Sequence, residues 1–153
     1  MRLTLSAFAV LSISMRLMAA EPFVGTWKLN LEKSTLQGNS AEIASEKMTI
    51  SKTGTNTHRT TIDIVLKSGK TLHQEFNRTL DGKEHPTAEV GLKEEGDTET
   101  VERINVSTRK IIDKKDGKLL SEITSTVSPD GKMMTNVRTN ADGRRDTLVF
   151  ERQ

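Results

Sequence analysis

The chain of 153 residues has no cysteine and no tyrosine, and it has only one tryptophan, three prolines and four phenylalanines. The absence of cysteine excludes a disulfide scaffold, a thiolate nucleophile and a metal site built on cysteine. With so few aromatic side chains, a surface on which nucleic-acid bases stack is not expected. The 23 basic residues are nearly balanced by 21 acidic ones, so the basic stripe typical of nucleic-acid binders is also missing. We therefore expect no nucleic-acid partner.

The first twenty residues differ in character from the rest. Arg2 forms a minimal basic start, Leu3–Ile13 is mostly apolar, and Met18–Ala20 ends in small residues, which is the order of a secretory signal peptide. The stretch is too short to span a membrane and is interrupted by Arg16. An uncleaved anchor or a disordered tail is the alternative. We predict a signal peptide over residues 1–20, one domain over residues 21–153, a periplasmic or secreted location, and no stable membrane span after cleavage.

Most of the remaining sequence alternates between apolar and polar residues with a period of two, which is typical of strands that bury one face. Residues that share a face are Thr60, Ile62, Ile64 and Leu66; Leu72, Gln74, Phe76, Arg78 and Leu80; and Leu119, Ser121, Ile123, Ser125 and Val127. We predict an all-β fold of eight to ten short antiparallel strands in an up-and-down meander. A meander of this length avoids two open edges by closing into a barrel, whereas a sandwich, the main alternative, needs longer crossover connections.

Four turn sequences separate neighbouring runs, and each has glycine in third place: Lys67–Gly69, Lys115–Gly117, Pro129–Gly131 and Ala141–Gly143. This placement is typical of three-residue hairpin loops. A loop of that length at Lys67–Gly69 pairs Ile64 with Leu72 and Thr60 with Phe76, which keeps apolar residues on one face.

The later loops are less uniform. A three-residue loop at Pro129–Gly131 pairs Val127 with Met133 and Ile123 with Val137. The alternative register, with Val127 opposite Met134 and Ile123 opposite Arg138, brings an arginine to the apolar face and is disfavoured. At Ala141–Gly143 the same rule turns Val149 inward and leaves Leu148 and Phe150 outside, so this register stays open. Only Asn39–Glu42 resembles a capping box, which predicts one or two helical turns over Ala41–Glu46.

The first predicted strand, Phe23–Asn30, carries a Gly-Thr-Trp motif at residues 25–27. This Gly-x-Trp resembles the opening strand of calycin barrels, the superfamily of lipocalins and fatty-acid-binding proteins. Asp81–Pro86 and Ser128–Lys132 extend the resemblance to small secreted bacterial lipocalin-like proteins. The resemblance implies a calycin-like β-barrel.

The resemblance also implies that Trp27 and Gly25 are structural residues at the closed end of the barrel. Lipocalins stack an arginine on this tryptophan, and Arg152 or Arg145 is expected to do so here. Fatty-acid-binding proteins add a pair of helices after the first strand, for which Glu32–Ser45 is too short. They also hold a carboxylate with an Arg-x-Tyr near the C-terminus, which this chain lacks.

Arg78 belongs to a same-face apolar series and faces His58 across the predicted hairpin. An inward arginine is suited to binding a ligand carboxylate; the alternative places Arg78 at the rim, in water. Arg103 is a weaker candidate. The residues predicted to line the interior, with Arg78 as polar anchor and His58 beside it, are Ile62, Ile64, Leu72, Gln74, Phe76, Ile123, Ser125 and Val137.

These features predict a protein that holds a small hydrophobic or amphipathic molecule inside a β-barrel, because eight to ten strands enclose more room than small inward side chains fill. A structural or protein-interaction module, with an apolar patch around Leu148 and Phe150, is the second hypothesis. No nucleophile motif is present, so an enzyme is not expected; a barrel enzyme using His58 and Arg78 is the third. We predict no cofactor and no metal site, since the histidines lack ligand spacing. No oligomeric state is predicted.

Overall fold

The computed structural model describes residues 21–87, 89–90 and 97–153, so the predicted signal peptide lies outside the described residues. All strands belong to one antiparallel sheet of eleven. They are β1 (Gly25–Leu29), β2 (Ile43–Lys52), β3 (Thr57–Leu66), β4 (Thr71–Thr79), β5 (Glu84–Pro86), β6 (Glu89–Val90), β7 (Thr98–Arg103), β8 (Thr108–Lys115), β9 (Lys118–Val127), β10 (Met133–Asn140) and β11 (Arg145–Arg152). In the part of the chain that is described, no helix is long and apolar enough to cross a membrane.

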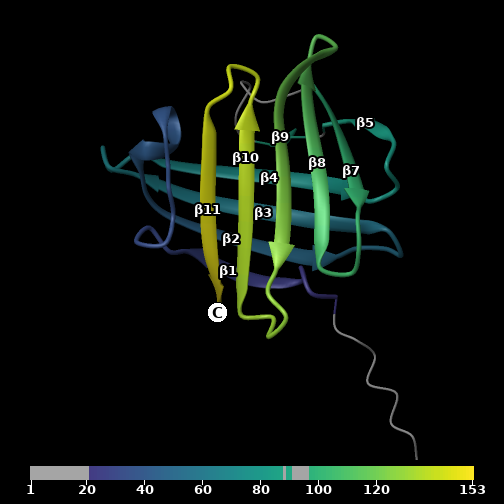
Figure 1. Cartoon of the computed structure of the whole chain (residues 1–153), viewed down its shortest axis with the longest axis horizontal. Coiled ribbons are helices and arrows are strands. Elements are labelled where there is room, and N and C mark those ends of the chain that lie inside the picture. The colour runs from purple at the N-terminus through teal and green to yellow at the C-terminus, as the bar shows by residue number, and fades with distance from the viewer. Residues whose placement is uncertain (1–20, 88, 91–96) are drawn as a thin grey trace, which may run out of the picture.

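The sheet is a meander that curls until its first strand meets its last. The strand order is β5-β7-β8-β9-β10-β11-β1-β2-β3-β4-β6, and β1 pairs with β11 through Leu29 and Phe150. Figure 1 shows β1–β4 running across the picture behind the upright β7–β11, so two crossed layers enclose the interior. The prediction of an all-β antiparallel meander that closes into a barrel is confirmed.

Closure is incomplete at one seam, between β4 and β7. These two strands lie beside each other but are not hydrogen-bonded neighbours in the sheet. The short β5 pairs with β7, and the two-residue β6 pairs with β4. An ion pair crosses the seam, because Nε of Arg78 on β4 lies 3.1 Å from Oε2 of Glu99 on β7. Side chains thus link the two strands where backbone pairing is interrupted.

The closed end is built around Trp27, which is fully buried and donates its Nε1–H to the Phe23 carbonyl at 3.0 Å. The Arg152 guanidinium lies 4.1 Å above the tryptophan ring, so Arg152, and not Arg145, takes the stacking position. Gly25 has a φ of +144°, and a Cβ there would collide with Nη1 of Arg152. The surrounding core consists of Phe23, Trp27, Leu29, Ile43, Met48, Ile50, Val127, Met134 and Phe150.

The hairpin between β3 and β4 has the predicted register, since Ile64 pairs with Leu72 and Thr60 pairs with Phe76. The register predicted at Pro129–Gly131 is wrong. Val127 lies opposite Met134 and Ile123 lies opposite Arg138, because the turn contains four residues between Ser128 and Met133. The rule that failed was the assumption that every inward residue is apolar.

This shift has consequences for the neighbouring strands. Arg138 pairs with Asp146 across a three-residue loop at 141–143. Phe150, four residues along the same face, is therefore turned inward and fully buried. At the β8–β9 turn the predicted three-residue loop is also wrong. Lys115 pairs with Lys118, and Asp116 and Gly117 both have positive φ, which is the conformation of a two-residue type I′ turn.

The segment between β1 and β2 forms a single 3-10 turn, η1 (Gly38–Glu42). The predicted helix over Ala41–Glu46 is therefore wrong, because β2 begins at Ile43. The segment is held to the barrel by Asp146, whose carboxylate is buried and accepts hydrogen bonds from the Gln37 N–H at 2.6 Å and the Ser40 hydroxyl at 3.1 Å. Tertiary contacts with β11 thus fix a stretch that local sequence signals misassign.

A cavity inside the barrel

The barrel encloses a cavity of about 580 Å³. One part of its wall is apolar and comes mainly from β3, β4 and β9. The apolar residues there are Ile62, Ile64, Leu72, Phe76 and Ile123, joined by Leu148 of β11. The other part is polar and contains Gln74, Arg78, Arg109, Ser125, Asn136 and Arg138. A space with both kinds of wall suits a molecule that is itself partly apolar and partly polar.

Most residues predicted to face the interior do line the cavity: Ile62, Ile64, Leu72, Gln74, Phe76, Arg78, Ile123 and Ser125. Val137 does not. In the observed register Arg138 pairs with Ile123, so Asn136 and Arg138 face inward and Val137 faces outward. His58 is buried but is not part of the cavity wall.

Arg78 lies inside the barrel and not at its rim. The side chain is 8% exposed, its Nε contacts Glu99 at 3.1 Å, and its guanidinium lies 4.6 Å from the centre of the Phe76 ring. The neighbouring carboxylate balances its charge, as buried arginines generally require. Arg78 is therefore part of the link across the β4–β7 seam.

His58 pairs with Arg78 across the hairpin, as the sequence predicts, and lies below the cavity, near the chain start. Its Nε2 is 4.0 Å from Oε1 of Glu21, and Glu21 also contacts Arg103. Burial, together with the positive charge of Arg109, lowers the pKa of His58, while Glu21 acts in the opposite direction. His58 is therefore neutral at pH 7.

Arg109 on β8 is the residue that sequence reasoning missed. Its side chain is 1% exposed and stacks 4.4 Å from the centre of the Phe23 ring. Its Nε and Nη1 are buried and have no hydrogen-bond partner among the described residues. Burial first, and then the nearby Arg78, lower the pKa of Arg109 to about 9, with Glu99 acting in the opposite direction. Arg109 is thus a buried cation at neutral pH.

Arg109 heads a row of polar side chains that crosses three neighbouring strands. In the register of the sheet, Arg109 on β8 pairs with Ser125 on β9, and Ser125 pairs with Asn136 on β10. The Ser125 hydroxyl and Oδ1 of Asn136 are also buried without a partner among the described residues. Three adjacent strands therefore present unused hydrogen-bonding groups at one level of the cavity wall.

At the opposite end the cavity wall becomes exposed. Glu42 of η1, Lys70 before β4 and Arg144 before β11 belong to the wall and are exposed to solvent. The Asp146-bound segment with η1 lies at this end, since Gln37 and Ser40 are also part of the wall. We take this end as the mouth of the barrel, with the Arg109 row lying deeper.

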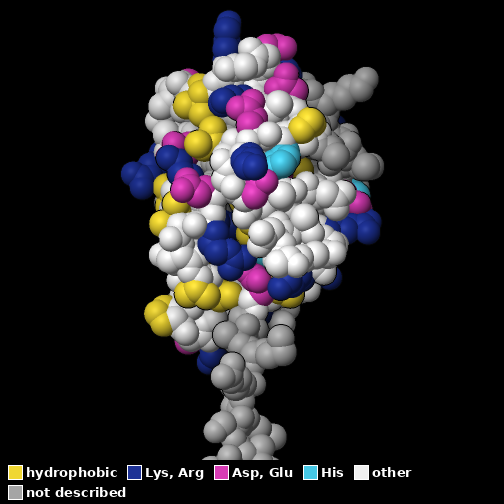
Figure 2. Space-filling model, turned by 90° about the vertical axis from the view of Figure 1, so that its right-hand side faces the viewer, with side chains coloured by type: hydrophobic (Ala, Val, Ile, Leu, Met, Phe, Trp, Pro, Cys, Tyr) yellow, Lys and Arg dark blue, Asp and Glu magenta, His cyan; other side chains and the backbone are white. Residues whose placement is uncertain are grey.

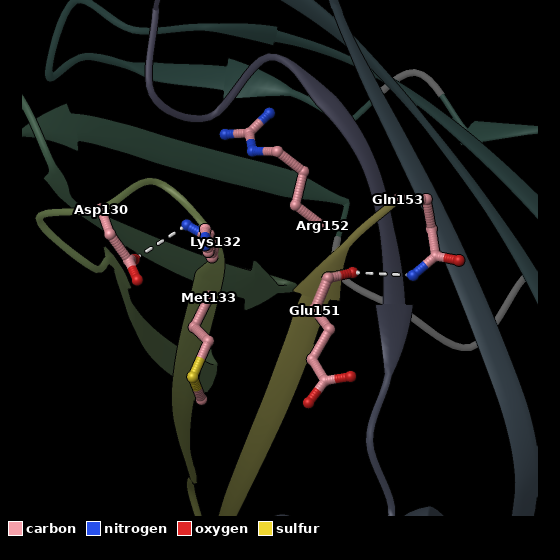
Figure 3. Close-up of a pocket in the computed structure, with 6 residues that line it drawn as sticks. All are labelled: Asp130, Lys132, Met133, Glu151, Arg152 and Gln153. Carbon is pink, nitrogen blue, oxygen red and sulfur yellow. Dashed lines mark hydrogen bonds between the residues drawn. The ribbon is translucent and has the colours of Figure 1, made fainter.

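A second hollow, of about 500 Å³, lies outside the barrel near the C-terminus. Figure 3 shows that its lining comes from the β10–β11 region, with the Arg152 guanidinium directed away from the side chains of Met133 and Glu151. That guanidinium is engaged with the carbonyls of the closed end. The hollow therefore offers only surface side chains such as Asp130 and Lys132, and we do not regard it as the functional site.

The outer surface carries no single-sign field on the face that can be inspected. Figure 2 shows basic and acidic side chains intermixed over the side of the molecule that includes β7. Within the described residues, no three His, Asp or Glu side chains gather as a metal site would require. The unusual chemistry of the chain is therefore concentrated in the interior.

Comparison with known proteins gives a fold but no family. No family model matches the chain, and no curated protein matches it. Among solved structures, the wild-type fluorescent protein UnaG superposes with a TM-score of 0.64 at 16% identity, over 87% of this chain and 98% of UnaG. The chain has a calycin-like fold. Two point mutants of UnaG agree, with TM-scores of 0.65 and 0.63 at 17% and 18% identity, over 87% and 86% of this chain and 97% and 96% of theirs.

Proposed function

We propose that the protein is an exported binding protein that holds a small, partly apolar molecule inside its β-barrel. The observation that carries this proposal is the cavity of about 580 Å³, a volume within the range of about 300–1,000 Å³ that is usual for small-molecule sites. The cavity lies inside a barrel of calycin-like fold, and its wall combines aliphatic side chains with a few polar groups.

The apolar wall supplies the driving force for binding. A ligand that covers Ile62, Ile64 and Leu72 removes their side chains from water, which contributes about 25 cal/mol per Å² of apolar area. The polar groups orient the ligand, since buried donors and acceptors discriminate against molecules that leave them unpaired. Binding without chemistry is the proposal, and no residue is assigned a catalytic role.

The alternative of a protein-interaction module rested on an exposed apolar patch around Leu148 and Phe150. Phe150 is fully buried and Leu148 lines the cavity, so these residues offer no outer surface to a partner. We therefore favour binding inside the barrel over docking on its outside.

A thermal-shift screen against lipids and metabolites tests the proposal, because a ligand that binds only the folded state raises the unfolding midpoint. The matched variants are Ile64→Trp, which fills the cavity, and Val65→Trp, which places the same bulk on the exposed outer face of β3. We expect a compound that stabilises the wild type to stabilise Val65→Trp equally and Ile64→Trp not at all. Equal stabilisation of all three proteins contradicts binding in the cavity.

Export is a separate part of the proposal, and it is supported by the order of basic, apolar and small residues over positions 1–20. Expression of the full chain, followed by cell fractionation and mass measurement of the purified protein, tests it. We expect the protein outside the cytoplasm with its N-terminal segment removed. Full-length protein confined to the cytoplasm contradicts export and leaves the binding proposal intact.

A further inference from the structure

The deep end of the cavity holds more positive than negative charge. Arg78 and Arg109 both lie there, and Glu99 acts on both of them. The carboxylate of Glu99, however, makes its contact with Arg78. Two cations therefore share one anion, and Nε and Nη1 of Arg109 have no acceptor among the described residues.

A buried guanidinium in this condition is energetically unfavourable unless something else satisfies it. The Phe23 ring, 4.4 Å from Arg109, attracts the cation through its face. A ring face does not replace the oxygen acceptors that the in-plane N–H groups need. The arrangement is therefore incomplete by one anionic group that carries oxygen acceptors.

The neighbours of Arg109 indicate where such a group lies. Ser125 and Asn136 follow Arg109 in the register of three adjacent strands. With a strand spacing of about 4.8 Å, the row spans about 10 Å across the cavity wall. The Ser125 hydroxyl has no partner among the described residues and can donate to the same oxygen acceptors as Arg109. Two donors of different strands thus face one position.

We propose that the bound molecule is an amphipathic carboxylate, with its carboxylate against Arg109 and Ser125 and Asn136 beside it. This inference rests on the proposed function and adds the class of ligand and its orientation. The excess of one positive charge matches a carboxylate, whereas a phosphate group brings up to two negative charges. The apolar part of the molecule extends from the polar row along Ile62, Ile64 and Leu72 toward the mouth.

Titration calorimetry with decanoate and decanol tests this assignment, because the two probes share a chain and differ in the head group. In the wild type we expect decanoate to bind roughly 10- to 100-fold more tightly than decanol, as charge-assisted hydrogen bonds imply. In Arg109→Met this preference disappears, with decanol binding unchanged. Arg109→Lys, which keeps the charge, retains part of it. Arg59→Met is the matched control, since Arg59 lies on the outer face of β3, and it keeps the full preference.

A second variant guards against a folding defect in Arg109→Met. Ser125→Ala removes one donor and little volume, and we expect decanoate to bind several-fold more weakly with decanol unaffected. Equal binding of decanoate and decanol by the wild type overturns the assignment and leaves the proposed function standing. Unchanged decanoate binding by both Arg109→Met and Ser125→Ala overturns it as well. If neither probe nor any compound of the thermal-shift screen binds the wild type, the proposed function fails together with this inference.

Discussion

Two buried arginines, Arg152 at the closed end and Arg109 in the cavity wall, have similar stacking geometry and different hydrogen bonding. Arg152 lies 4.1 Å from the centre of the Trp27 ring, and Arg109 lies 4.4 Å from that of Phe23. Nitrogens of Arg152 donate to the carbonyls of Pro22 at 2.5 Å, Val24 at 2.7 Å and Gly131 at 2.6 Å. Arg109 has two nitrogens without any partner among the described residues.

The difference separates a structural region from a binding region. At the closed end the protein itself completes every contact of the arginine, so the site needs nothing further to be stable. In the cavity wall the donors are positioned but unused, which is the condition of a site that a ligand completes. Substitutions at the closed end should therefore reduce stability, whereas substitutions in the polar row should mainly change binding.

The largest effect is expected for Trp27→Ala at the closed end. Removal of a fully buried tryptophan leaves a cavity in the core, and we expect a loss of about 3–5 kcal/mol in the free energy of unfolding. Urea denaturation followed by far-ultraviolet circular dichroism measures it, since the only tryptophan is removed. Leu31→Ala, at an exposed apolar residue, is the control and should change the free energy by less than about 0.5 kcal/mol.

The next largest effect separates the two arginines directly. Arg152→Met leaves three carbonyls without their charged donor, and we expect a loss of about 2–4 kcal/mol in unfolding free energy. Arg109→Met removes a buried cation that lacks acceptors, so the ligand-free protein should be no less stable than the wild type. Denaturation of both variants side by side makes the measurement. A comparable loss in both would erase the distinction between the two regions.

Gly25→Ala should be intermediate in cost, about 1–3 kcal/mol, since a side chain at a φ of +144° is strained and its Cβ meets Arg152. Gly69→Ala is a suitable control, because Gly69 has a φ of +83° and nothing within 4 Å of the added Cβ. Thermal denaturation should show a smaller loss for Gly69→Ala. Equal losses would mean that the closeness of Arg152 adds nothing to the backbone strain.

The smallest expected effect concerns pH. Burial, with Arg109, lowers the pKa of His58 in the folded state below its ordinary value of 6.5. As pH falls below 6.5 the unfolded chain binds a proton that the folded chain does not, so the unfolding free energy decreases, by at most about 1.4 kcal/mol per pH unit until the folded pKa is passed. Denaturation between pH 8 and 5 should show this slope in the wild type and in His73→Gln. It should be reduced in His58→Gln, and an unchanged slope there would assign the effect to other groups.

The sequence predicted the parts of the fold in which local pattern and burial agree. The Gly-Thr-Trp at residues 25–27 and the β3–β4 hairpin obey simple rules, because apolar residues face inward and the turn fixes the register. The Pro129 turn broke the rule, since Arg138 faces inward and Val137 does not. A polar cavity makes the inward face partly polar, so the test that prefers apolar inward residues selects the wrong register there.

The same reason explains what was missed at the candidate site. Arg78 was recognised because it ends a clear apolar series, yet it is engaged with Glu99 on a strand that follows 20 residues later in the chain. Arg109 shares a face with the buried Ile111, which is a signal that was available two residues away. Whether an arginine is satisfied depends on the neighbouring strands, and only the assembled barrel specifies those neighbours.

A crystal structure of the protein grown with decanoate tests the central claim most directly, namely that the barrel interior is the binding site. We expect decanoate inside the barrel, with its carboxylate within hydrogen-bonding distance of Arg109 and its chain along Ile64 and Leu72. Decanoate in the outer hollow near Met133, or an interior filled by rearranged side chains, would contradict the account.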